Sequence, residues 1–339
     1  MVSAVLTPDT LSVSRRDHVP VLAEPAVSSL ITDPAGTYVD GTVGLGGHAL
    51  RIAGRLEDPG RLIAVDRDEA ALAEAKKRLK FFGERVTFFR DNFRNVPLIL
   101  NRLGIQRIHG LLLDLGVSSL QLDDPERGFS FQADGPLDMR MDRSRKTCAA
   151  DLVNGLPESE LADLFYRFGE ERRSRAIARR IAEARAVRRL NSTLELASLV
   201  ESVIGRPPNS RIHPATRVFQ ALRIAVNEEL EKLGEFLEEA AGVLVPGGRL
   251  VVISFHSLED RIVKNTFRRL EGRCVCRMPV GLCRCPRAAQ ARVLTPKPRE
   301  ADEDEVARNP RCRSARMRVL EKLPRQAAGA PGAEPPRVR

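Results

Sequence analysis

Residues 38–48 read YVDGTVGLGGH, in which four glycines fall within seven positions directly after a short strand-like run. A strand followed by such a turn lets backbone N–H groups approach a ligand closely. Residues 44–49, GLGGHA, fit the dinucleotide-binding pattern, and Asp66 follows Gly46 by 20 residues, where an acid binds ribose hydroxyls. Taken alone, this stretch suits NAD, and it is also compatible with a plain tight turn.

Asp40 points to a different cofactor. It ends the strand immediately before the glycines, where a carboxylate would repel a pyrophosphate but attract an ammonium or sulfonium group. S-adenosylmethionine carries both cations and no phosphate, and its ribose would still favour Asp66. Phe93, after the third predicted strand, could contact an adenine, and Asp114, after the fourth, would face the reacting group. The alternative role for these carboxylates is to cap a helix or a turn.

Strand and helix patterns alternate along much of the chain. This alternation predicts a parallel α/β sheet that binds ligands at the carboxyl ends of its strands. Strands are predicted near residues 37–41, 60–68, 85–93, 108–119, 249–257 and 315–323, and helices near 49–56, 68–82 and 258–270. Only helical patterns occupy residues 151–202, and the periodicity of residues 213–244 predicts one long helix ended by Pro246-Gly247-Gly248.

The predicted organisation is an α/β domain interrupted by a helical insertion. The expected segments are a flexible tail (1–16), the first part of the core (17–132), the helical insertion (133–212), the second part of the core (213–323) and a disordered tail (324–339).

Charge and composition limit the compartment and the partners. The 339 residues carry a formal net charge of +10, which favours a polyanionic partner, although an arginine-rich proteome gives the same excess. The N-terminus lacks the pattern of a signal peptide, and no apolar run approaches the ~18 residues of a membrane span. We therefore expect a cytoplasmic protein with no membrane partner.

Several long motifs resemble the RsmH (MraW) family of S-adenosylmethionine-dependent methyltransferases. The resemblance runs from about residue 18 to 323 and is carried by HVPVLAEPAV (18–27), YVDGTVGLGGH, LLLDLGVSSLQLDDPERGFSF (111–131), HPATRVFQALRIAVNEEL (213–230) and PGGRLVVISFHSLEDRIVK (246–264). It implies the doubly wound sheet of a Rossmann-like class I methyltransferase with an inserted all-helical domain. It also implies methylation of the exocyclic 4-amino group of a cytidine in 16S ribosomal RNA, at the decoding centre of the small subunit. The cofactor contacts that it implies are Gly46, Gly47, His48, Asp66, Phe93, Asp114 and Gln121.

The catalytic group is less clearly indicated. Asp114 is the first candidate, because a carboxylate there could orient an amine and stabilise the positive charge that the amine gains. Residues 254–257, SFHS, are the alternative. The Asp/Asn-Pro-Pro-aromatic motif of many amine methyltransferases is replaced here by Asp114-Leu-Gly-Val, so Phe129, Phe131 or Phe255 would have to stack on the target base.

The helical insertion is rich in arginine. Between Arg167 and Arg189 lie nine arginines and three glutamates, which predicts a surface that contacts RNA phosphates or, alternatively, an ordinary solvated helix face. His213, Arg217 and Arg223 are further candidates for this surface. The target cytidine would have to be unpaired or flipped out.

Four of the six cysteines are clustered late in the chain. Cys274, Cys276, Cys283 and Cys285 form a C-x-C, six-residue, C-x-C pattern, which suggests a structural zinc site remote from methyl transfer. The alternative is a loop of uncoordinated, redox-labile thiols. Cys148 and Cys312 are isolated.

Two other classes of function compete with methyl transfer. An NAD-linked dehydrogenase would explain the glycine turn, but no hydride-transfer acid can be placed. An RNA-binding assembly factor that has kept the fold without activity is the second alternative, and the intact Asp66, Asp114 and glycine turn argue against it.

Overall fold

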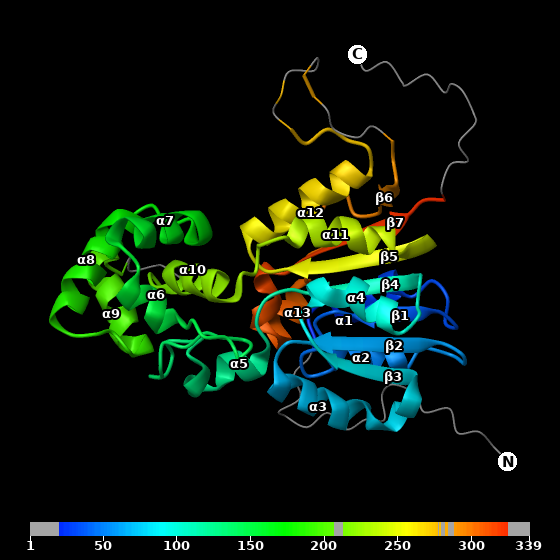
Figure 1. Ribbon diagram of the computed structural model, residues 1–339, viewed down its shortest axis with the longest axis horizontal. Coiled ribbons are helices and arrows are strands. Elements are labelled where there is room, and N and C mark those ends of the chain that lie inside the picture. The colour runs from blue at the N-terminus through cyan, green and yellow to red at the C-terminus, as the bar shows by residue number, and fades with distance from the viewer. Residues whose placement is uncertain (1–19, 207–212, 277, 279–281, 284–287, 325–339) are drawn as a thin grey trace.

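A twisted sheet of seven strands lies at the centre of the molecule (Figure 1). This computed structural model describes residues 20–206, 213–276, 278, 282–283 and 288–324. Both tails expected from the sequence therefore lie outside the described residues, apart from residue 324. The strands are β1 (Thr37–Asp40), β2 (Arg61–Asp66), β3 (Val86–Arg90), β4 (Ile108–Asp114), β5 (Leu244–Ser254), β6 (Ala291–Val293) and β7 (Arg316–Lys322).

The strand order is β3-β2-β1-β4-β5-β7-β6. Strands β1 to β5 are parallel, and β7 runs antiparallel to both β5 and β6. This is the doubly wound sheet of a Rossmann-like class I methyltransferase, so the predicted fold class is confirmed. The order reverses between β1 and β4, and in open α/β sheets a ligand binds at this point, beyond the carboxyl ends of the strands.

Helices cover both faces of the sheet. Those packed on it are α1 (Ala23–Leu30), α2 (Gly47–Ala53), α3 (Glu69–Leu79), α4 (Val96–Arg102), α11 (Leu233–Gly242), α12 (Ser257–Leu270) and, near β7, α13 (Glu303–Arg308). Successive strand residues enter opposite cores, as β1 illustrates: Tyr38 packs with α1 and α2, while Val39 packs with α4 and α11. Because both faces are buried, the strands read as continuous apolar runs.

A separate helical region lies beside the sheet, at the left of Figure 1. Its helices are α6 (Ala149–Gly155), α7 (Glu158–Gly169), α8 (Ser174–Val187), α9 (Thr193–Ile204) and α10 (Thr216–Asn227). They bury a third apolar core, centred on residues such as Phe165, Ile181 and Leu222. No helix among the described residues is long and apolar enough to cross a membrane.

The single helix expected over residues 213–244 is wrong, because two helices occupy this stretch. Glu228 ends α10 in a left-handed conformation (φ 51°), and Lys232 begins α11 in another (φ 53°). Asn227 holds the break: its side chain accepts from Met141 N–H and donates to the Met139 carbonyl. These long-range bonds leave no trace in the helical periodicity. Pro246-Gly247-Gly248 is also not a separate helix stop, since it lies inside β5 beside an irregularity in the β4–β5 pairing.

Candidate active site

The carboxyl ends of the parallel strands open into one cavity. It occupies about 290 Å³, which is the scale of a small-molecule site. Six of the seven cofactor residues expected from the sequence line it, and these are Gly47, His48, Asp66, Phe93, Asp114 and Gln121. The topology therefore brings together residues that are up to 74 positions apart in the chain.

Gly46 provides the backbone conformation that the glycine turn requires. It caps the start of α2 with a left-handed backbone (φ 82°), and a Cβ there would lie 3.4 Å from the Cα of Ala75 on α3. Gly46 is not among the described residues that line the cavity. Glycine is needed here because the turn must bend this way and pack closely on the neighbouring helix.

Asp66 fastens the turn to the end of β2. Its two carboxylate oxygens accept from Gly44 N–H at 2.7 Å and from Asp68 N–H at 2.9 Å. Burial raises the pKa of Asp66, and these two hydrogen bonds oppose the rise. Because each carboxylate oxygen can accept a second hydrogen bond, Asp66 can also bind ligand hydroxyls.

Asp40 and Asp114 form an acidic pair at the ends of the adjacent strands β1 and β4, in which Asp40 is fully buried and 21% of the Asp114 side chain is exposed. Asp40 Oδ2 and Asp114 Oδ1 have no hydrogen-bond partner among the described residues. Burial raises the pKa of Asp40 to about 7, against a bond from Thr42 N–H, and the charge of Asp66 adds to the rise. Burial also raises the pKa of Asp114 well above its usual range, and Asp40 and Glu259 contribute. Two neighbouring carboxyls that each keep one oxygen without a partner are suited to a ligand that carries positive charge.

His48 connects this acidic pair to the segment before α1. Its Nε2 lies 3.0 Å from the carbonyl oxygen of Val21, and because a carbonyl only accepts, Nε2 carries the proton. The other ring nitrogen, Nδ1, lies 3.7 Å from Asp114 Oδ2. When the ring is neutral, Nδ1 turns a lone pair toward that oxygen, which favours a protonated Asp114.

Gln121 lines the cavity on a rigid support. It lies on α5 (Ser119–Asp123), where its Oε1 accepts from Ser118 N–H at 3.0 Å as part of a capping box. Its Nε2 donates to Asp68 Oδ2 at 2.7 Å, and Arg127 Nη1 lies 2.9 Å from the same oxygen. Both ends of the amide are thus engaged within the protein.

The three phenylalanines considered for base stacking occupy different places. Phe129 lies in the helical core and Phe131 packs against it. The centroid of the Phe131 ring is 4.7 Å from that of His213 and 4.7 Å from that of Phe219. Phe255 lines the cavity, and its ring would lie 3.4 Å from a Cβ placed on Gly116. Among the three candidates, only Phe255 therefore lines the cavity of the described chain.

The alternative catalytic stretch, residues 254–257, contributes Phe255 alone to the cavity lining of the described chain. The hydroxyl of Ser254 donates to the Arg316 carbonyl at 3.3 Å, and that of Ser257 bonds to Glu170 on the helical side. His256 Nε2 lies 3.2 Å from Glu259 Oε1 at the start of α12. These polar groups join β5 and α12 to their neighbours.

The prediction that Arg223 belongs to an exposed RNA-contacting surface is wrong. Its side chain is only 16% exposed, and its guanidinium donates to both carboxylate oxygens of Glu229, each at 2.9 Å. Arg223, Glu229 and Glu259 all line the cavity. Although burial favours the neutral acid, His256 and Arg223 lower the pKa of Glu259. The sequence carries no signal for the Arg223–Glu229 pair, because residues six apart do not share a face of one continuous helix.

The arginines of the helical region have different environments, and four of them, Arg179, Arg180, Arg188 and Arg189, form ion pairs with carboxylates. Arg173 donates to the last carbonyls of α9, and Arg185 donates to the Val153 and Leu156 carbonyls at the end of α6, so both stabilise helix ends. By contrast, Arg172 and Arg175 are exposed and form no ion pair with a residue that the structure describes. Outside the arginine-rich stretch, Arg217 is exposed at 3.7 Å from Glu171, and His213 lies 3.4 Å from Glu201.

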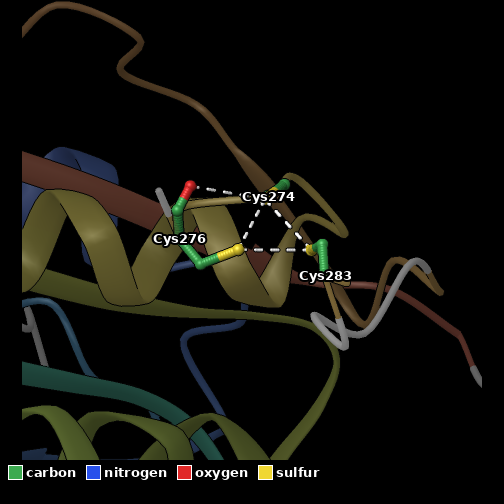
Figure 2. A group of neighbouring side chains, drawn as sticks. All are labelled: Cys274, Cys276 and Cys283. Atoms are coloured by element: carbon green, nitrogen blue, oxygen red, sulfur yellow. Dashed lines mark hydrogen bonds between the residues drawn. The ribbon is translucent and has the colours of Figure 1, made fainter. Parts of the chain in front are cut away.

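Three of the four clustered cysteines converge beyond the end of α12. Figure 2 shows the thiols of Cys274, Cys276 and Cys283 directed toward one another, with each pair of Sγ atoms 3.3 Å apart. Cys285, the fourth member of the pattern, lies outside the described residues. Cys148 and Cys312 lie elsewhere, the latter buried in the core of the sheet.

The sheet order, the glycine turn and the acidic pair together define a Rossmann-like methyltransferase with a helical insertion. The chain belongs to the MraW methylase family, whose family model matches residues 15–323. A protein of Carboxydothermus hydrogenoformans is 48% identical over 306 residues, which cover 90% of this chain and 98% of that protein. One of Syntrophotalea carbinolica is 51% identical over 307 residues, with coverage of 90% and 98%. Both relatives are named ribosomal RNA small subunit methyltransferase H.

Proposed function

We propose that the cavity binds S-adenosylmethionine. The observation that carries this proposal is the acidic pair: Asp114 lines the cavity, Asp40 is buried at the end of the adjacent strand, and Asp40 Oδ2 and Asp114 Oδ1 have no hydrogen-bond partner among the described residues. A ligand with an ammonium and a sulfonium group would compensate both carboxylates, while its ribose hydroxyls would bond to Asp66 and its adenine would contact Phe93. Gly47, His48 and Gln121 complete the proposed contacts.

NAD is a poorer fit for the same cavity. Its pyrophosphate would lie near the glycine turn, where Asp114 lines the cavity and Asp40 is buried next to it, and negative carboxylates repel phosphate. Titration of the protein with each cofactor by calorimetry separates the two. Binding of NADH but not of S-adenosylmethionine would overturn the proposed cofactor.

We further propose that the methyl acceptor is the exocyclic 4-amino group of a cytidine in 16S ribosomal RNA, at the decoding centre. Support comes from the relatives, which are named as small subunit ribosomal RNA methyltransferases, and from the resemblance of the motifs around Asp114 and Phe255. A cytosine amine is a weak nucleophile because its lone pair is delocalised into the ring. Stacking on Phe255 and a hydrogen bond to Asp114 would orient that amine in line with the methyl group.

When bound, S-adenosylmethionine supplies an electrophilic methyl group on a sulfonium sulfur. A neighbouring positive charge keeps Asp114 ionised, so the carboxylate can accept a hydrogen bond from the amine. Once that charge is lost, burial again raises the pKa of Asp114. Asp114 can then take the proton that the methylated amine must release, and we propose it as the catalytic residue on this ground.

The deciding experiment uses methyl-labelled S-adenosylmethionine with small ribosomal subunits that lack the modification. We expect one labelled cytidine in the 16S RNA, mapped by nuclease digestion and mass spectrometry, and no label with the Asp114→Asn variant. A wild-type protein that binds the cofactor but labels neither particles nor free RNA would overturn the function and favour a non-catalytic assembly factor. Label on another base would overturn only the cytidine assignment.

The remaining parts of the proposal concern place and partner. We propose that the protein acts in the cytoplasm, with the helical region of residues 133–212 as its RNA-binding surface. The exposed Arg172 and Arg175 support this assignment, since they are available to phosphates. The cysteine cluster contributes no group to methyl transfer, because the 14-residue helix α12 separates it from the cavity by about 20 Å.

A further inference from the structure

The three thiols of Cys274, Cys276 and Cys283 lie at the corners of an equilateral triangle. Each Sγ–Sγ distance is 3.3 Å, and the three sulfurs come from two segments of the chain that are seven residues apart (Figure 2). A disulfide requires an S–S distance of about 2.05 Å and joins two sulfurs, so it cannot account for three equivalent contacts. The arrangement has the form of a ligand set.

Apolar packing does not explain why these thiols meet. They lie on the connection between α12 and β6, whose base is closed by a hydrogen bond from Gln290 N–H to the Leu270 carbonyl. None of the described residues of this connection is buried, and Met278 and Leu282 are 56% and 63% exposed. A long connection without a core of its own needs another source of order, and a bound ion is one.

We propose that Cys274, Cys276 and Cys283 bind a single Zn²⁺ ion. Zinc accepts thiolate ligands at about 2.3 Å, so an ion touching all three sulfurs would stand about 1.3 Å above their plane. That position leaves its outer side open to a fourth ligand, which completes the tetrahedron that structural zinc sites prefer. An iron–sulfur cluster is a poorer fit, because its cysteines bind different irons and are held farther apart.

The charge of the surrounding sequence favours such a site. A zinc ion with three thiolates carries a net charge of −1, and the sequence from residue 272 to 299 contains arginines and lysine but no aspartate or glutamate. Nearby cations therefore offset the charge of the complex without a carboxylate competing for the metal. The ion would connect the segment after α12 to the segment leading toward β6 and would fix the path of this connection.

Metal analysis of the purified full-length protein tests the site directly. After loading with zinc and removal of excess ion, we expect one equivalent of zinc by plasma mass spectrometry in the wild type and in the Cys148→Ser control. Cys276→Ser and Cys283→Ser should each lose most of it. A metal-free wild type, or cysteine variants that keep a full equivalent, would overturn the proposal.

Alkylation mapped by mass spectrometry provides a readout that does not depend on folding of the variants. In the native, reduced, zinc-loaded protein, Cys274, Cys276 and Cys283 should be protected from iodoacetamide and should become reactive when a chelator is added. The exposed position of Cys274 makes this contrast sharp, since burial cannot protect it. Equal reactivity with and without chelator would contradict a metal site, and a disulfide found between any two of the three under reducing conditions would replace it.

Discussion

His48 and Asp114 lie side by side at the bottom of the cavity, with imidazole Nδ1 3.7 Å from carboxylate Oδ2. Nε2 of the same ring donates a hydrogen bond to the Val21 carbonyl. His48 therefore links the segment before α1 to the carboxyl group at the end of β4. The position of Asp114 therefore depends on the glycine turn that carries His48 as well as on its own strand.

Replacing Asp114 with asparagine tests its proposed role. Asp114→Asn keeps the shape but removes the negative charge and the proton acceptor, so methyl transfer at saturating S-adenosylmethionine should fall about a hundredfold or more. Asp58→Asn, at an exposed position in the turn before β2, is the matched control and should behave as the wild type. Steady-state rates with labelled cofactor measure the effect. A full rate for Asp114→Asn would remove this residue from catalysis.

Cofactor affinity should depend on pH through Asp40. In the empty protein its pKa is about 7, so below that pH the carboxyl is protonated and must release a proton when a cation binds. Affinity should therefore rise as pH increases toward 7, by up to tenfold per unit for the Asp40 proton, and Asp114, whose pKa is also raised, adds a second linked proton. Calorimetry in buffers of different ionisation enthalpy would detect the released proton. A pH-independent affinity from pH 5.5 to 8 would contradict the linkage.

Stability should show the opposite trend. The pKa of Asp40 is about 7 in the folded protein and near 3.8 when unfolded, so its contribution is fully present below pH 3.8 and is lost as pH rises through 7. Asp40→Asn removes this loss. The melting temperature of the empty variant relative to wild type should thus increase between pH 5 and 7. The same substitution should weaken S-adenosylmethionine binding about ten- to a hundredfold, because a charged partner is lost. A variant with lower stability at pH 8 would show that Asp40 is not strained by burial.

The glycine turn should be sensitive at Gly46. A side chain there must adopt φ 82° and press on Ala75, so Gly46→Ala should reduce the free energy of unfolding by about 1–3 kcal/mol. Gly155→Ala is the control, since a Cβ at the end of α6 meets nothing within 4 Å. Urea denaturation measures both. Equal stability of the two variants would mean that the turn adapts to a side chain.

RNA binding by the helical region should depend on salt. If Arg172 and Arg175 each contact a phosphate, replacing both with alanine should reduce the slope of log K against log salt by about 1.5. Arg61, at the amino end of β2, and Arg102, at the end of α4, are exposed and lie outside the helical region, so they provide a double-alanine control. Filter binding of small-subunit RNA at several salt concentrations gives the slopes. An unchanged slope for the Arg172/Arg175 variant would exclude these two arginines from the RNA surface.

The α/β fold class and six of the residues that line the cavity were predictable from the sequence. Each parallel strand is a short apolar run that ends in a polar residue, as with Asp40, Asp66 and Asp114. Because the carboxyl ends of parallel strands meet at one edge of the sheet, these residues were expected to lie close together. The glycine turn was also predictable from the sequence, because only glycine adopts a left-handed backbone conformation readily. The resemblance of several long motifs to one family then favoured S-adenosylmethionine over NAD as the ligand, and membership of that family was confirmed.

The pairing of the polar groups could not be predicted from the sequence, because it depends on how the folded segments meet. The pKa values of Asp40 and Asp114 rise because the fold buries them together, and neither burial nor proximity can be read from residues 74 positions apart. The sequence predicted that Arg223 contacts RNA, but the helix break after Asn227 places it against Glu229. Hydrogen bonds between the Asn227 side chain and the backbone of Met139 and Met141 hold this break. Periodicity records which face of a helix is apolar, whereas these bonds depend on segments that meet only after folding.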